Sequence, residues 1–202
     1  MEITSIILAG GKSQRFGKDK TSEVIGGESF LERVIQQVSR VSADVIISTA
    51  ANQLLPIFNT SANIIQAVDV YPDKCSLGGI YSGLQKSRSQ YNLVVAADMP
   101  FLNIDLIRYL IKQTNSEYDI IVPRVQNRPE PLHSIYSKNC VEAIQELFDH
   151  DILRVTAILD KVKVRWVEEE EINTFDFAHR SFMNINTQED MKNAKLLLAQ
   201  DL

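Results

Sequence analysis

The segment Ile3–Lys20, ITSIILAGGKSQRFGKDK, passes from an apolar run into two adjacent glycines and then into a basic stretch. Its first part, Ile3–Ala9, is rich in isoleucine, which predicts a short buried strand. Gly10 and Gly11 carry no Cβ, so the backbone after this strand can turn tightly and approach a ligand closely. Successive amide N–H groups in such a turn can form an anion-binding concavity. The segment therefore predicts a first strand with a candidate ligand loop at its carboxyl end.

Strand-like and helix-like runs alternate along much of the remaining chain. Four further buried strands are expected at Asp44–Thr49, Asn63–Val68, Asn92–Ala97 and Asp119–Pro123. One helix is expected after Ser29, which forms a capping-box pattern with Glu32, and another after Asn103, a suitable N-cap residue. Parallel strands need such crossover helices. We therefore expect an α/β, Rossmann-like fold with a mostly parallel sheet flanked by helices on both faces.

The C-terminal third is less regular. Strands are expected at residues 132–137 and 162–167, a helix at residues 139–150, and a closing helix capped by Thr187. The acidic run Glu168–Glu171 is expected to be a solvated turn, because like charges repel one another and prefer water. No internal repeat or low-complexity linker divides the chain, so this part is expected to belong to the same domain as the rest.

The composition is that of a globular protein. The chain has 202 residues, of which 45% are hydrophobic and 23% charged, so residues 1–202 are expected to form one domain. Its net charge of −5 gives no reason to expect nucleic acid or an anionic membrane as a partner. The apolar N-terminal run is too short to span a bilayer and lacks a basic flank, and Cys75 and Cys140 match no metal spacing. We expect a cytoplasmic protein.

The basic stretch after the glycines stands out against this negative charge. Lys12, Arg15, Lys18 and Lys20 face only Asp19, a net +3 within nine residues. Composition alone leaves two interpretations open: a phosphate cradle, or a charged helix face that follows a turn. The spacing excludes a P-loop, since Gly-Lys is followed by Asp rather than Ser or Thr. Adjacent glycines also exclude the Gly-x-Gly-x-x-Gly dinucleotide fingerprint.

What the stretch Leu8–Lys20 does resemble is the signature of the MobA family, the molybdenum cofactor guanylyltransferases. Four further segments resemble motifs of this family in the expected order. They are VDVYPDKCSLGGIYSGL (residues 68–84), VVAADMPFL (94–102), RPEPLHSIYSKNC (128–140) and FMNINTQED (182–190). The resemblance covers nearly the whole chain, and it implies a single MobA-like nucleotidyltransferase domain.

The resemblance also implies roles for individual residues. The nucleotide-binding set is expected to be Leu8, Ala9, Gly10, Gly11, Lys20, Asp69 and Asp98. Asp98 is further expected to hold Mg²⁺, and Asn184 and Asn186 to contact the molybdopterin-bearing substrate. Arg15 matches the arginine of the motif, and we assign it as a phosphate clamp, since guanidinium binds phosphate bidentately. Catalysis would then depend on Arg15, Lys20 and Asp98.

The implied reaction is Mg²⁺-dependent transfer of GMP from GTP to the molybdenum–molybdopterin cofactor, with release of pyrophosphate. Proteins that deliver molybdopterin and that mature molybdoenzymes would be partners. The alternatives are cytidylyl transfer from CTP, nucleotidyl transfer to a sugar phosphate, and a non-catalytic GTP-binding protein of the same fold.

The sequence departs from the family pattern at three places. Phe16 stands for the usual Met, Cys75-Ser76 stands for the usual Gly-Pro, and Ser48 stands where some members carry Asn.

Several of these residues also have plain structural interpretations. Asp98 could be a helix N-cap, and Asp69 an ordinary loop carboxylate. Tyr71 and Tyr81 could stack on a base, but packing against their neighbours is the simpler expectation. Asn184 and Asn186 alternate along an extended segment, so their side chains should face the same way, although turn capping is the rival interpretation. The three histidines share no ligand spacing and are expected to be structural or surface residues.

Overall fold

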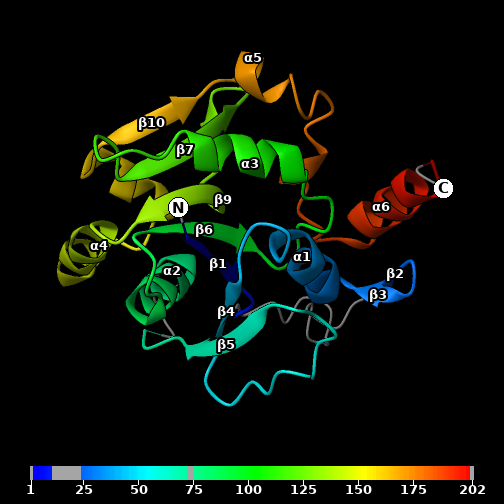
Figure 1. Ribbon diagram of the computed structural model, residues 1–202, viewed down its shortest axis with the longest axis horizontal. Helices are drawn as coiled ribbons and strands as arrows, with labels where there is room; N and C mark the ends of the chain where they lie inside the picture. Colours follow the sequence, from blue (N-terminus) through cyan, green and yellow to red (C-terminus); the bar gives the residue numbers. More distant parts are fainter. Residues whose placement is uncertain (1, 11–23, 72–74, 201–202) are drawn as a thin grey trace.

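The structure is a computed structural model that describes residues 2–10, 24–71 and 75–200 (Figure 1). Its main sheet has the strand order β10-β7-β9-β6-β1-β4-β5, with β8 paired to β7. These strands are β1 (Ile3–Leu8), β4 (Asp44–Thr49), β5 (Asn63–Val68), β6 (Tyr91–Ala96), β7 (Ile120–Val125), β8 (Arg128–Pro129), β9 (His133–Ser137) and β10 (Val164–Val167). A separate hairpin joins β2 (Val24–Ile25) to β3 (Glu28–Ser29).

Most neighbouring strands are parallel, as expected. The pairs β1–β4, β1–β6, β4–β5 and β7–β10 are parallel, whereas β9 runs antiparallel to both β6 and β7. Since β9 reverses the direction twice, β7 and β10 point the same way as β6. The carboxyl ends of six strands and the start of β9 therefore lie at one edge of the sheet, which is where ligands bind in such folds.

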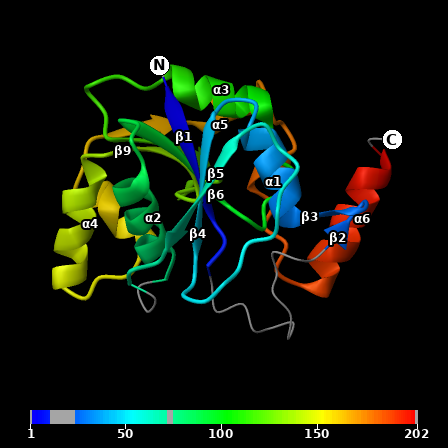
Figure 2. The same cartoon turned by 60° about the horizontal axis from the view of Figure 1, so that its bottom comes forward.

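Helices cover both faces of the sheet (Figures 1 and 2). The helical elements are α1 (Phe30–Val38), α2 (Cys75–Lys86), α3 (Ile104–Lys112), α4 (Cys140–Asp149), η3 (Val155–Asp160), α5 (Glu169–Ile172), η4 (Arg180–Phe182) and α6 (Gln188–Gln200). In Figure 2, α2 and α4 lie on one side of β1, and α1 lies on the other. Among the described residues, no helix has the length and apolar character needed to cross a membrane.

Side chains alternate between the two faces of the sheet along each strand, and they form a separate hydrophobic core on each face. Ile7 and Val95 belong to the core beneath α1 and α3, whereas Ile6 and Val94 belong to the core beneath α2 and α4. Successive strand side chains point to opposite faces, so a strand buried on both faces must be apolar at nearly every position. This confirms the predicted α/β architecture with helices on both faces.

Three predicted helix starts are confirmed. The Ser29 and Glu32 side chains form the reciprocal capping box of α1. The Asn103 side chain accepts from the backbone N–H groups of residues 105 and 106 at the start of α3, so Asn103, and not Asp98, caps this helix. Thr187 Oγ1 accepts from the Asp190 N–H at 3.0 Å, while the Asp190 carboxylate accepts from the Thr187 N–H at 2.8 Å.

Helix α2 was not predicted as a helix, because its glycines lower intrinsic helix propensity. The structure shows why glycine is needed at this surface. A Cβ on Gly83 would lie 2.4 Å from Cγ2 of Ile6, and one on Gly79 would lie 3.1 Å from the Ser48 Oγ. Helix α2 thus packs directly on β1 and β4, and its first turn lies at the carboxyl edge of the sheet.

The prediction of a solvated turn for the acidic run Glu168–Glu171 is wrong. The run forms the start of the short helix α5, and the backbone N–H of Glu168 donates to the Glu171 carboxylate at 3.2 Å. Acidic side chains are favourable in the first turn of a helix, where they interact with its free N–H groups. The repulsion between like charges is therefore offset by local helix geometry.

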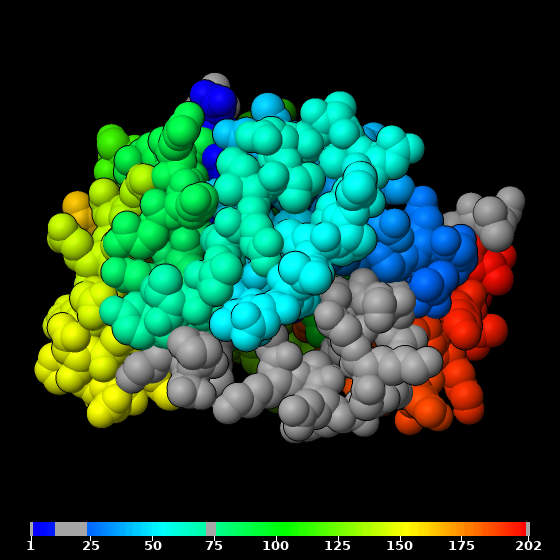
Figure 3. Space-filling model, turned by 90° about the horizontal axis from the view of Figure 1, so that it is seen from below, coloured from blue at the N-terminus to red at the C-terminus, as the bar shows by residue number. Residues whose placement is uncertain are grey.

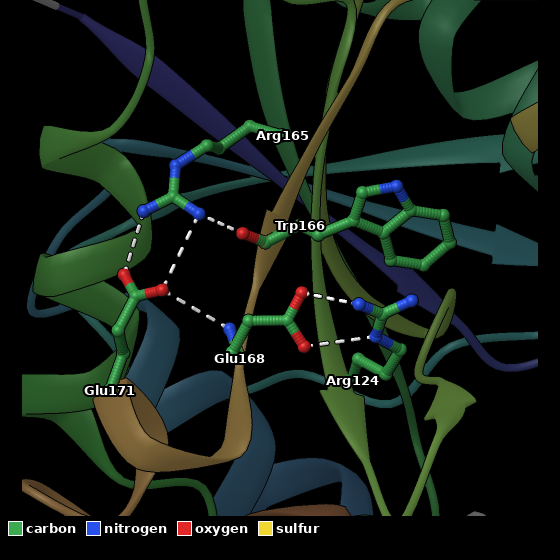
Figure 4. Close-up of polar contacts among 5 residues, drawn as sticks. All are labelled: Arg124, Arg165, Trp166, Glu168 and Glu171. Atoms are coloured by element: carbon green, nitrogen blue, oxygen red, sulfur yellow. Dashed lines mark hydrogen bonds and ion pairs between the residues drawn. The ribbon is translucent and has the colours of Figure 1, made fainter.

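Cations on two neighbouring strands also neutralise this run (Figure 4). Arg124, in β7, binds both oxygens of Glu168, with its Nε 2.9 Å from Oε2, and its guanidinium stacks 4.8 Å above the Trp166 ring. Arg165, in β10, binds Glu171 at 2.7 Å. Arg124 and Glu168 are 44 positions apart in the sequence, and only the pairing of β7 with β10 brings these two charges together.

Candidate active site

Backbone hydrogen bonds link the carboxyl ends of four strands. The N–H of Ala97 donates to the Leu8 carbonyl at 3.1 Å, and the N–H of Asp69 donates to the Thr49 carbonyl at 2.8 Å. These bonds continue the strand pairing past β1, β4, β5 and β6. They hold the segments that carry Leu8, Asp69 and Asp98 at one edge, although 90 positions separate the first of these residues from the last.

The first residues of the glycine loop lie tightly against the end of β4. The N–H groups of Ala9 and Gly10 both donate to the Ser48 carbonyl, at 2.8 and 2.9 Å. A Cβ on Gly10 would lie 2.8 Å from the backbone nitrogen of Ala50, so this close approach requires glycine. The Gly10 amide is therefore already occupied, which corrects the expectation that it faces an anion. Gly11, Arg15 and Lys20 lie outside the described residues.

Asp69 is held firmly at the start of α2. Its Oδ1 accepts from the Tyr71 N–H at 2.8 Å and from the Ser82 hydroxyl at 3.4 Å. A Cβ on Gly78 would lie 2.9 Å from the same oxygen, so glycine leaves room for this carboxylate. Burial raises the pKa of Asp69 above its ordinary range, and the two hydrogen bonds oppose that effect. Both hydrogen bonds that described residues donate to this carboxylate end on Oδ1.

Asp98 lies two residues after the end of β6 and is tied to the C-terminal part of the chain. Its backbone carbonyl accepts from the N–H of Ile185 at 3.0 Å. Ile185 is buried, while Asn184 is half-buried and Asn186 is exposed on either side of it, as alternation along an extended segment predicts. The structure thus brings Asp98 beside the segment that carries both asparagines. The Asn184 amide donates to the Phe182 carbonyl at 3.4 Å, and Thr187, rather than Asn186, caps α6.

The aromatic side chains near Asp69 pack on one another. The rings of Tyr71 and Tyr81 are 5.4 Å apart, and Tyr71 lies 4.7 Å from Phe148 of α4. The Tyr71 hydroxyl donates to the Gln145 side chain at 3.2 Å. This confirms the packing interpretation for both tyrosines. Figure 3 shows α2 and α4 at the side of this face, with the loop after β4 lying between α2 and α1.

The three histidines are structural or surface residues, as expected. His133 is fully buried against Phe182, and burial lowers its pKa to about 4. His150 contacts the Glu146 carbonyl and His179 contacts the Asn173 side chain, each at 2.8 Å. In the described part of the chain, no group of three His, Cys, Asp or Glu side chains could hold a metal ion. Among the described residues, a metal at Asp98 would therefore find fewer than three His, Cys, Asp or Glu ligands.

Glu130 is a residue of this edge that the sequence does not single out. Its N–H donates to the Pro123 carbonyl at 2.9 Å, so it lies beside the end of β7. Two residues later, the Leu132 carbonyl accepts from the N–H of Ala96, which precedes Asp98 by two positions. Burial raises the pKa of the Glu130 carboxyl. Glu130 lies within the segment 128–140 that resembles a family motif, but the resemblance assigned it no role.

Residues 5–166, which are most of the chain, match the family model of the MobA-like NTP transferase domain. This chain belongs to the MobA-like NTP transferase family. It is 33% identical to a molybdenum cofactor guanylyltransferase from Desulfosudis oleivorans, with 96% of this chain and 94% of that protein covered. It is also 30% identical to a probable molybdenum cofactor guanylyltransferase from Natranaerobius thermophilus, with 98% and 97% covered. The chain is a nucleotidyltransferase with a role in molybdenum cofactor biosynthesis.

Solved structures confirm the fold. A molybdopterin-guanine dinucleotide biosynthesis protein A from Archaeoglobus fulgidus superposes with a TM-score of 0.80 at 23% identity, with 98% of this chain and 99% of that chain covered. A 2-C-methyl-D-erythritol 4-phosphate cytidylyltransferase from Thermus thermophilus superposes with a TM-score of 0.71 at 16% identity, with 98% of each chain covered. Since MobA-like and cytidylyltransferase chains share this fold, the fold alone does not identify the nucleotide.

Proposed function

We propose that this protein transfers GMP from GTP to the molybdenum–molybdopterin cofactor, forming the guanine dinucleotide and releasing pyrophosphate. The observation that carries the proposal is the joining of Gly10, Asp69, Asp98 and the Asn184–Asn186 segment at one edge of the sheet. The names of the near-full-length relatives, which are guanylyltransferases, support GTP over CTP.

In the proposed reaction, an oxygen of the terminal phosphate of molybdopterin attacks the α-phosphorus of GTP. The bond between this phosphorus and the bridging oxygen breaks, and pyrophosphate leaves with the electron pair. Both reactants are anions, so catalysis depends on positioning and on neutralising charge. Leu8, Ala9 and Gly10 would form the wall along the nucleotide, and the Oδ2 atom of Asp69 would accept a donor from it.

Asp98 would hold Mg²⁺ at the phosphates. The donor set fits this ion, because Mg²⁺ is commonly bound by one or two carboxylates together with substrate phosphates and waters. When bound, the ion would neutralise charge on phosphate oxygens. From the sequence pattern, Lys20 and Arg15 would neutralise further charge on the leaving pyrophosphate, and Asn184 and Asn186 would contact the pterin-bearing substrate.

The proposal is tested by measuring pyrophosphate release from GTP, CTP and ATP, each with and without molybdopterin. We expect release from GTP only when both molybdopterin and Mg²⁺ are present. Turnover with CTP but not with GTP would replace the guanylyl assignment by the cytidylyl alternative. Tight GTP binding without any release in the presence of acceptor would instead favour a non-catalytic GTP-binding protein.

A further inference from the structure

Glu130 lies at the carboxyl edge of the sheet, and its partly buried carboxylate has no partner among the described residues. Among the described residues, none donates a hydrogen bond to this carboxylate and no cation pairs with it. Other partly buried acids of this protein are satisfied. Asp176 accepts from the backbone N–H groups of Arg180 and Ser181, and Glu171 binds Arg165. An ionised carboxylate without partners is costly to bury.

Hydrogen bonds and two prolines fix the backbone from which the Glu130 side chain extends. Its N–H donates to the Pro123 carbonyl, and its own carbonyl accepts from the His133 N–H at 3.0 Å and from the Ser134 hydroxyl at 2.7 Å. It lies between Pro129 and Pro131, whose rings fix the backbone φ angles on either side. Such rigidity is what a recognition residue needs, because little conformational entropy is lost when a ligand binds.

The position of Glu130 in the sheet indicates which substrate it meets. The strand order is β7-β9-β6-β1-β4-β5. Glu130 lies between the ends of β7 and β8 and the start of β9, which is on one side of Asp98, two residues past the end of β6. Gly10 and Asp69, the proposed nucleotide residues, lie on the other side, after β1 and β5. A substrate that meets the nucleotide at Asp98 would therefore extend toward Glu130.

We propose that Glu130 is a specificity residue for the acceptor, and that its carboxylate accepts the N–H and NH₂ donors of a 2-amino-4-oxopyrimidine ring. This inference rests on the proposed function, in which the acceptor carries a pterin. A pterin presents this donor pair at N3 and the 2-amino group, and a planar carboxylate can accept both at once. Guanine presents the same pair, so a test must separate the two sources.

A metal ion is the weaker explanation for this carboxylate. At Asp98 the proposed Mg²⁺ would take substrate phosphate oxygens as further ligands, whereas the ring end of the acceptor carries no phosphate. The part of the chain that the structure describes also holds no group of three acidic, cysteine or histidine side chains that could replace them. A neutral ring with two N–H donors needs only one carboxylate. It also offsets the burial of the charge by hydrogen bonds to that charge.

The direct test measures the equilibrium binding of pterin and of lumazine to the full-length chain. The fluorescence of the ligand reports how much of it is bound. Lumazine carries a 2-oxo group in place of the 2-amino group, so it loses one donor and presents an acceptor to the carboxylate. We expect the wild type to prefer pterin by about tenfold or more, as for a hydrogen bond to a charged group. Glu130→Gln should lose this preference, whereas Glu142→Gln, an exposed acid on α4, should keep it.

Equal affinity of the wild type for the two ligands, or an unchanged preference in Glu130→Gln, would overturn the proposal. A second arm compares binding of GTP and ITP, which lacks the 2-amino group. If Glu130→Gln abolishes a preference for GTP over ITP and leaves pterin binding intact, the carboxylate recognises guanine and the acceptor assignment is wrong. These measurements need no turnover, so they remain decisive even if pyrophosphate release from GTP fails, which would overturn the proposed function.

Unfolding of the same variants distinguishes recognition from a structural role. Because the Glu130 carboxylate has no partner to lose among the described residues, Glu130→Gln should unfold at the same denaturant concentration as the wild type or a higher one at neutral pH. A structural carboxylate would give the opposite result. Weaker pterin binding in a variant of undiminished stability therefore supports the proposal, and loss of both together counts against it.

Discussion

The backbone of Asp98 makes one contact with the C-terminal part of the chain that a change of its side chain leaves in place. Its carbonyl accepts from Ile185, and that bond does not depend on the side chain. Asp98→Asn should therefore keep the fold but lower kcat by at least about 100-fold at saturating Mg²⁺, since charge neutralisation by a bound metal supplies several kcal/mol at the transition state. The measurement is pyrophosphate release, with unfolding as the check on stability. Asp105→Asn, on the exposed surface of α3, is the matched control. Wild-type turnover in Asp98→Asn would contradict the role.

His133 gives the fold a defined dependence on pH. Its ring is fully buried, its Nδ1 contacts the Ser181 carbonyl at 3.2 Å, and burial lowers its pKa to about 4 from 6.5. Between these two values the unfolded chain binds a proton that the folded chain does not. Stability is therefore complete above pH 6.5 and falls as the pH decreases toward 4, by at most about 1.4 kcal/mol per pH unit from this residue.

Urea unfolding of the wild type and of His133→Gln at several values between pH 7 and pH 4.5 would measure this contribution. The variant should be less stable at pH 7, because it alters a packed site, but its stability should decrease less steeply with acid. His150→Gln changes an exposed ring and should keep the wild-type slope. Equal slopes for all three proteins would show that His133 takes up its proton without unfolding.

At the scale of elements, α2 depends on glycine for its contact with β1. Alanine is the better helix former by about 1 kcal/mol, so Gly83→Ala would stabilise an isolated helix. In the protein, the added Cβ would lie 2.4 Å from Cγ2 of the fully buried Ile6, so we expect a net loss of about 1–3 kcal/mol from overpacking. Denaturant unfolding would measure this, with Gln85→Ala, on the exposed face of α2, as the control. A stabilised Gly83→Ala would show that α2 can move away from the sheet.

The elements also show where prediction from the sequence succeeded and where it could not. Caps such as Ser29 and Asn103 are local signals, and they were predicted because the residues that make them lie within three positions. Helix α2 was missed because its glycines, which are poor helix formers, are needed for a tertiary contact with Ile6 that the sequence does not show. The acidic helix α5 was missed because Arg124 neutralises Glu168 across 44 positions. The direction of β9 likewise depends on long-range pairing with β6 and β7.

For the candidate site, the sequence identified polar residues that follow the strands, but not the contacts that surround them. Asp69 and Asp98 were found from motifs, and the parallel sheet explains why they lie at one edge. That the Gly10 amide is bound to Ser48 depends on the contact between β1 and β4. Glu130 belongs to the edge only because β9 is antiparallel, so its start, rather than its end, lies beside Asp98.

At the scale of the whole molecule, Asp98 divides the edge into a nucleotide side and an acceptor side. If this division is correct, each ligand should stabilise the chain through different residues. A ligand at 100 times its dissociation constant adds about 2.7 kcal/mol to the free energy of unfolding, which a thermal unfolding curve resolves. Asp69→Asn keeps the Oδ1 acceptor for the Tyr71 N–H and the Ser82 hydroxyl, so it can test the nucleotide side without removing these bonds.

We therefore expect a crossed pattern when the melting temperature is measured with GTP and Mg²⁺, or with pterin, at fixed concentrations. Asp69→Asn should reduce the shift caused by GTP and leave the shift caused by pterin unchanged, whereas Glu130→Gln should do the reverse. Glu142→Gln should respond to both ligands as the wild type does. If either variant lost both shifts equally, the two ligands would share one pocket. The separation of nucleotide and acceptor on either side of Asp98 would then be wrong.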